Sequence, residues 1–160
     1  TGDLILFKAC DNLNSTTIFN YFTHIGIVVI DPILTKNEPY LFEAALVKNN
    51  NGILFTPLKK RLERYIGFTY YKSLSKKITN IMKLKLINFI NYALNNMYYN
   101  HNVIISSIYK KIMNIKCNNS TNCGELIFLC LINMGLLNEN LWISRKLHYL
   151  KWMCNIKKIN

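Results

Sequence analysis

The sequence lacks most of the signatures that would assign a function at once. It has no CxxC pair, no glycine-rich phosphate-binding loop, no dinucleotide fingerprint and no metal-binding motif. No stretch approaches the roughly 20 apolar residues of a membrane span. Internal repeats and low-complexity linkers are also absent. These absences exclude a motif-based assignment as a nucleotide-dependent enzyme or a zinc protein. We therefore expect one domain over residues 1–160, with no cofactor and no metal.

Cysteine is present, but not in a pattern typical of disulfide frameworks. The five cysteines are odd in number and irregularly spaced, at Cys10, Cys117, Cys123, Cys130 and Cys154. This usage predicts a reduced, intracellular protein of cytoplasmic type. No targeting segment is visible, although the chain begins at Thr1 rather than at methionine, which leaves a trimmed segment open.

Acidic residues are also scarce. The chain has 8 Asp and Glu against 20 Lys and Arg, which gives a net charge of +12. Such a balance suits anionic partners, namely nucleic acid, acidic lipid or acidic protein. Lysine, asparagine and isoleucine are frequent throughout, however, as an A+T-rich genome would produce. We favour this compositional explanation for the charge taken alone.

Hydrophobic patterning predicts strands first and helices afterwards. Short apolar or β-branched runs bounded by turn signals predict strands at 2–9, 22–30, 40–47, 52–56 and 67–72. The charged segment 59–65 is predicted to be a turn or a short helix. Helical spacing follows at 75–96, more weakly at 103–115, and again at 122–135, with a loop at 116–121. This order predicts an α+β fold with an antiparallel sheet packed against helices.

The C-terminal residues 136–160 form a basic tail that we leave unassigned. Within it, positions 142–159 mix basic residues with Leu, Ile, Met and Trp. The segment fits either a basic amphipathic helix or an irregular strand-like tail. Its composition weakly favours an anionic membrane surface as a partner.

The segment NCGELIFLCLINMG, residues 122–135, is the most informative of the chain. Asn122 is a good N-cap, with Glu125 three residues on as its capping-box partner, and Gly135 is placed to end the helix. The apolar run between them predicts a buried helix. Cys123 then falls at the first helical position, where unpaired N–H groups and the helix dipole favour a thiolate. A lone cysteine is nonetheless more often a small buried residue.

A cysteine nucleophile needs a base and an orienting group, and the second and third strands offer both. His24 lies near the start of THIGIVV, with Gly26 on the same face leaving room for an approaching group. Glu43 is a carboxylate inside an apolar strand, so we expect it to have a partner. A hairpin that sets His24 opposite Glu43 would present the histidine to the Cys123 helix. Each residue alone also fits an ordinary structural role.

The motifs GDLILF, HIGIVV, FEA and NCGELI resemble the circularly permuted papain-like hydrolases, the permuted branch of the NlpC-type cysteine peptidases. The YiiX-like group is the most similar, ahead of the poxvirus and lecithin:retinol acyltransferase groups. The resemblance implies a permuted papain-like fold in which Cys123 is the nucleophile, His24 the base and Glu43 the third member. It also implies acyl transfer on peptide, amide or acyl-lipid substrates. It spans residues 2 to about 135.

Three hypotheses follow from the sequence. The first is a thiol hydrolase, as an amidase or peptidase, or an acyltransferase, that acts through Cys123, His24 and Glu43. The second is a basic nucleic-acid or anionic-surface binding protein without catalysis, although the basic residues form no single stripe and no nucleic-acid motif appears. The third is an inactive binding domain on a hydrolase fold, which the intact triad disfavours.

Overall fold

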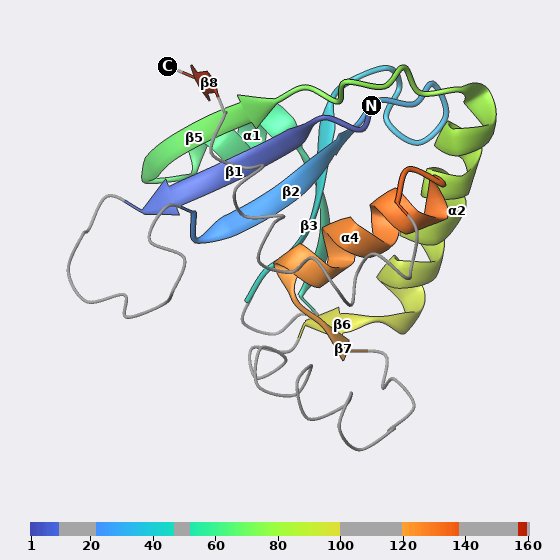
Figure 1. Cartoon of the computed structure of the whole chain (residues 1–160). Helices are drawn as coiled ribbons and strands as arrows, with labels where there is room; N and C mark the ends of the chain where they lie inside the picture. Colours follow the sequence, from blue (N-terminus) through green and yellow to red (C-terminus); the bar gives the residue numbers. More distant parts are fainter. Residues whose placement is uncertain (10–21, 47–51, 100–119, 138–156, 160) are drawn as a thin grey trace.

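The computed structural model describes residues 1–9, 22–46, 52–99, 120–137 and 157–159, and the following statements concern these residues. Six strands form one antiparallel sheet in the order β4-β3-β2-β1-β5-β8 (Figure 1). The strands are β1 (Leu4–Ala9), β2 (His24–Val29), β3 (Tyr40–Ala44), β4 (Ile53–Pro57), β5 (Gly67–Lys72) and β8 (Lys157–Ile159). The five strands and the antiparallel sheet predicted from the sequence are confirmed. The sixth, β8, comes from the tail, where the strand-like alternative holds for these three residues.

Three helices accompany the sheet: α1 (Leu58–Glu63), α2 (Asn80–Asn96) and α4 (Cys123–Asn133). Helices α2 and α4 lie on one face of the sheet, and α1 lies on the other. Side chains alternate along each strand, so the strands contribute apolar residues to both faces. On one face, Leu4, Leu6 and Phe42 belong to a core with the buried residues of α2 and α4. On the other face, Ile5 and Phe7 pack with Leu58 and Leu62 of α1. The α+β prediction is therefore confirmed, and the sheet lies between two helical layers (Figure 1).

Helix α2 begins five residues later than the sequence predicted. Thr79 caps it by accepting a hydrogen bond from the Met82 N–H at 3.3 Å. The preceding residues are held against the start of β1 instead, because the Leu74 N–H donates to Asp3 at 2.9 Å and the Ile78 side chain packs over Gly2. These tertiary contacts outweigh the helical spacing of the apolar residues.

A short parallel pair precedes α4. Strand β6 (Tyr98–Tyr99) pairs with β7 (Ser120–Thr121), so the last two residues of the predicted loop 116–121 form a strand instead. The predicted helix at 103–115 and most of the tail lie outside the described residues. Among the helices that are described, none is long and apolar enough to cross a membrane.

Candidate active site

Helix α4 presents Cys123 as its first residue. The Asn122 side chain accepts a hydrogen bond from the Glu125 N–H at 2.8 Å, which confirms the predicted N-cap. The predicted C-terminal stop is also confirmed, because Gly135 has a φ of 73° and donates its N–H to Ile132 at 2.7 Å. The helix packs against α2, β2 and β3. Cys123 is therefore held at the positive end of a well-anchored helix, where a thiolate is favoured.

His24 and Glu43 are in direct contact, but not in the register that the sequence suggested. Glu43 pairs with Gly26 rather than with His24, so His24 reaches it diagonally on the same face. The His24 Nε2–H donates to Glu43 Oε2 at 2.6 Å. The Glu43 side chain is fully buried, whereas that of His24 is 15% exposed. The predicted partner of the carboxylate is thus correct, although the predicted register is wrong by two residues.

The predicted orientation of His24 also needs correction. The face that carries His24 and Glu43 is the one covered by α1, because Val28 and Leu41 on the same face pack with Leu58 and Leu62. Cys123 and His24, the first residue of β2, interact closely enough for each to shift the pKa of the other. Gly26 leaves no room for an approaching group, since a Cβ there would lie 2.8 Å from Leu41.

Arg61 of α1 completes the surroundings of the carboxylate. Its Nε–H donates to Glu43 Oε1 at 2.6 Å, so both oxygens of Glu43 accept a charged or imidazole donor. The guanidinium lies over the Phe7 ring, 4.6 Å from its centroid. Arg61 was not predicted as a site residue from the sequence. Leu58 and Leu62 mark the apolar face of α1, and Arg61, three residues after Leu58, falls on that face.

The charges of these groups influence one another strongly. Burial raises the pKa of the Cys123 thiol, but the hydrogen bond and charge of His24, together with the N–H groups of Ile25 and Gly124, outweigh it and lower the pKa. Burial lowers the pKa of His24, yet the bonds and charges of Cys123 and Glu43 raise it to about 9. Opposite shifts of this kind favour a thiolate–imidazolium pair at neutral pH.

Glu43 remains ionised within this cluster. Burial raises its pKa, but the hydrogen bonds and charges of His24 and Arg61 lower it below the ordinary value of 4.5. Burial, followed by the charge of Cys123, raises the pKa of Tyr99. The three residues predicted from the sequence therefore lie together, with Arg61 and Tyr99 as additional neighbours.

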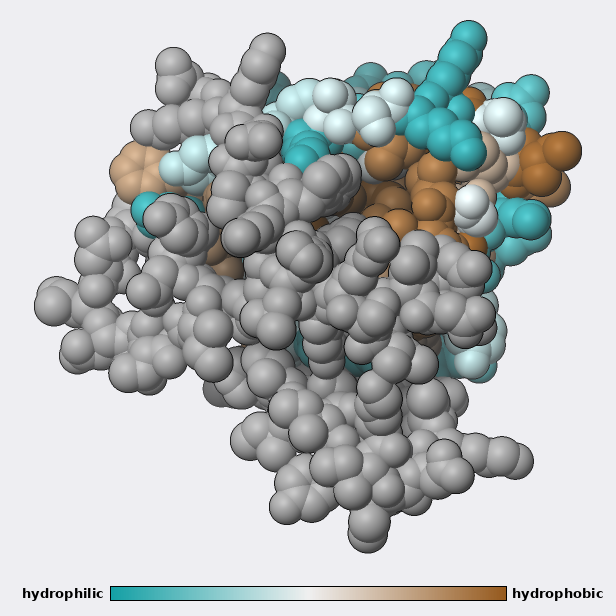
Figure 2. Space-filling model, viewed as in Figure 1, coloured by the Kyte–Doolittle hydropathy of each residue, from teal (hydrophilic) through white to brown (hydrophobic). Residues whose placement is uncertain are grey.

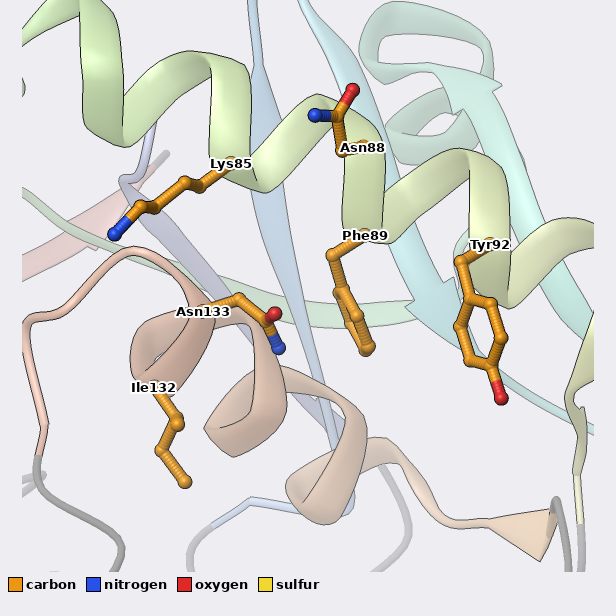
Figure 3. A pocket seen from close by; sticks show the side chains of 6 residues that line it. All are labelled: Lys85, Asn88, Phe89, Tyr92, Ile132 and Asn133. Carbon is orange, nitrogen blue, oxygen red and sulfur yellow. The ribbon is translucent and has the colours of Figure 1, made fainter.

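A separate groove lies between α2 and the far end of α4. Its lining side chains, shown in Figure 3, are Lys85, Asn88, Phe89, Tyr92, Ile132 and Asn133. Ile132 follows Cys123 by nine residues, which is about 14 Å along a helix axis. Hydrophobic surface is visible on the α2 side of the molecule in Figure 2. Ile81 and Leu84 of α2 are exposed. The residues that line this groove include no cysteine or histidine, and the groove is distinct from the Cys123 cluster.

Comparison with solved structures shows which known fold the chain shares. No family model and no curated protein matches the chain. Among solved structures, the crystal structure of metalloprotein YiiX from Escherichia coli O157:H7 is similar, with a TM-score of 0.58 and 17% sequence identity. The match covers 99% of this chain and 87% of YiiX. The chain therefore has the YiiX fold, which confirms the predicted resemblance at the level of the fold.

Proposed function

We propose that this protein is a cysteine-dependent acyl-transfer enzyme, either a thiol hydrolase acting on amides or esters or an acyltransferase. The observation that carries the proposal is the chain of contacts at the start of α4. His24 donates to the buried carboxylate of Glu43 at 2.6 Å, and Cys123 is close enough to His24 for each to shift the pKa of the other. A nucleophile, a base and an orienting group in contact are what covalent acyl transfer requires.

The first half-reaction forms an acyl-enzyme. The Cys123 thiolate attacks the carbonyl carbon of the substrate and forms a C–S bond, which moves an electron pair onto the carbonyl oxygen. The oxyanion is stabilised by backbone N–H groups at the start of α4. His24, as imidazolium, then donates its proton to the leaving nitrogen or oxygen while the bond to carbon breaks. The product is acyl-Cys123 with a neutral His24.

The second half-reaction releases the acyl group. Neutral His24 takes a proton from water, an amine or an alcohol while that acceptor attacks the thioester carbonyl. Breaking the C–S bond restores the thiolate and leaves His24 as imidazolium. Water as acceptor gives hydrolysis, whereas an amine or alcohol gives transfer. Glu43 holds the imidazole in the required orientation through both halves.

A resident metal is not part of this proposal, although YiiX is called a metalloprotein. Within the described ranges, no group of three or more His, Cys, Asp or Glu side chains is arranged to hold a metal. At the candidate site, both oxygens of Glu43 are already occupied by His24 and Arg61. A cationic guanidinium 2.6 Å from the carboxylate also opposes a metal ion there. These residues do not fit a metal centre.

Acyl-enzyme capture tests the proposal. The protein would be treated with p-nitrophenyl acetate and with an acetyl thioester, and the acylated residue would be located by peptide mass spectrometry. We expect acetylation at Cys123 and p-nitrophenol release that Cys123→Ala reduces to the background rate. Cys130→Ala is the matched control, because Cys130 is fully buried and burial raises its thiol pKa.

Two further outcomes of this experiment are informative. Release into water alone would indicate a hydrolase, whereas an N-acetylated product that forms from an added primary alkylamine with the wild type but not with Cys123→Ala would indicate transfer to an amine acceptor. Acetylation spread over lysines, equal in the wild type and in Cys123→Ala, would contradict the proposal.

A further inference from the structure

The environment of Glu43 contains a cation that the proposed mechanism does not yet use. Arg61 Nε and His24 Nε2 donate to different oxygens of the same carboxylate, each at 2.6 Å. The Glu43 side chain has no exposed surface, and that of Arg61 is 21% exposed. The pair is thus largely removed from water. Burial of a carboxylate costs free energy unless the carboxylate is paired with a cation and hydrogen-bonded.

One aromatic ring fixes both donors. Phe7 pairs with His24 across β1 and β2, and the two ring centroids lie 5.3 Å apart. The Arg61 guanidinium lies over the same Phe7 ring at 4.6 Å and near the Tyr65 ring at 5.6 Å. A planar guanidinium stacked on aromatic rings loses little freedom when it forms its hydrogen bond. Phe7 therefore restricts the positions of both side chains that donate to Glu43.

The charge of Arg61 determines the net charge of the cluster during the reaction. With a thiolate at Cys123 and an imidazolium at His24, Glu43 and Arg61 make the cluster neutral. Once the imidazolium has given its proton to a leaving group, His24 is neutral and Glu43 remains as a buried anion. Arg61 is then the cation that still contacts Glu43, and a guanidinium does not lose its proton in proteins. Among the described residues, the phenols of Tyr65 and Tyr99 are further titratable groups of this region.

We propose that Arg61 is a positioning residue of this site, whose guanidinium keeps Glu43 ionised and aimed at His24 while the histidine gains and loses its proton. This inference rests on the proposed function. It assigns a task in the reaction to a residue on α1, on the opposite face of the sheet from α4. In addition to any contribution to stability, this role predicts that loss of the guanidinium changes the titration of His24 and Cys123.

The test compares three variants in the full chain. Arg61→Gln removes the charge but keeps a neutral hydrogen-bond donor, and Arg61→Lys keeps the charge. Arg64→Gln is the matched control, because it removes the same charge from an exposed position three residues later. Thermal melting would establish which variants fold. The readouts are the pH dependence of Cys123 alkylation by iodoacetamide and the titration of the His24 imidazole followed by ¹⁵N NMR.

Removing a cation raises the pKa of each neighbouring acid. We therefore expect the alkylation profile of Cys123 and the titration of His24 both to move to higher pH in Arg61→Gln, with alkylation about tenfold slower on the rising part of the profile. Arg61→Lys should stay within about threefold of the wild type, and Arg64→Gln should match it. A folded Arg61→Gln protein with the wild-type profile of both groups would overturn the inference.

This outcome is separable from failure of the proposed function. Absence of acyl-Cys123 in the wild type would reject acyl transfer, whereas an unchanged His24 titration in Arg61→Gln rejects the role of Arg61. If Arg61→Gln does not fold, the wild-type protein supplies the test through its Arg61 Nε–H resonance. We expect that signal to be protected from exchange and to shift as His24 titrates near pH 9. A resonance indifferent to that titration would overturn the inference.

Discussion

Substitution of His24 by alanine is expected to slow acylation of Cys123 by about 10²- to 10⁴-fold, the usual contribution of a positioned proton-transfer group. The physical reason is twofold. Burial raises the pKa of the Cys123 thiol, and the hydrogen bond and charge of His24 are its largest opposing influences. Without the imidazole, the thiol is mostly protonated at neutral pH and the leaving group has no proton donor.

The measurement is single-turnover acetylation by p-nitrophenyl acetate, followed by the mass of the Cys123 peptide. Thr23→Ala is the matched control, since Thr23 is the exposed neighbour of His24 and bonds to the Phe7 carbonyl at 3.2 Å. We expect the control to keep the wild-type rate. Equal rates in folded His24→Ala and wild-type protein would show that the histidine is a structural residue.

Glu43→Gln is expected to destabilise the fold by about 3 kcal/mol at neutral pH, because breaking a buried ion pair leaves its partners uncompensated. Glu43 is fully buried and accepts from both His24 and Arg61. A glutamine keeps the size of the side chain but loses its charge, so two cationic groups lose their counter-ion. Urea unfolding would measure the loss, which is large against a typical total of about 5–15 kcal/mol.

The pH dependence of this loss has a definite sign. The pKa of Glu43 is lowered in the folded protein from its ordinary value of 4.5. Ionised Glu43 therefore contributes stability that is present above pH 4.5 and disappears as the pH falls through the folded pKa. The difference between wild type and Glu43→Gln should be constant from pH 7 to about 5 and should then shrink in acid.

Glu63→Gln provides the control for this experiment, because Glu63 is an exposed carboxylate on α1. Its substitution should change the free energy of unfolding by less than about 0.5 kcal/mol. A Glu43→Gln protein as stable as the wild type at pH 7 would show that the carboxylate is not the buried partner of two cations.

Local signals in the sequence predicted much of the fold. Asn122 and Gly135 bound α4 because capping and a left-handed glycine depend on a few adjacent residues. Strands β1 to β5 were predicted correctly in existence and order because apolar runs and turn residues are also local. The nucleophile candidate followed directly, since the N-cap fixes which residue is first in the helix.

The register and the surroundings of Glu43 depend on features that are not local. Between β2 and β3, Lys36 and Asn37 adopt positive φ values, and the Asp31 side chain accepts from the Ile33 and Leu34 N–H groups. This turn places Gly26, not His24, opposite Glu43. Positive φ at a lysine is uncommon, so the pattern of residue types did not reveal it.

Arg61 was not predicted for a similar reason. It lies in a run of basic residues, and such runs usually face solvent. Its contact with Glu43 depends on α1 folding back over β1, β2 and β3, which only the tertiary structure shows. The tertiary structure likewise shows that His24 lies on the α1 face of the sheet and reaches Cys123 at the strand end.

The central claim is that Cys123 is an activated thiolate paired with His24. The most direct test is the pH dependence of its alkylation by iodoacetamide in the wild-type protein, read by mass spectrometry with Cys130 as internal reference. We expect Cys123 to react faster than Cys130, and to do so at pH values below the usual pKa of about 8.5 for a free thiol. A Cys123 that reacts only as the pH passes that of a free thiol, or no faster than Cys130, would contradict the account.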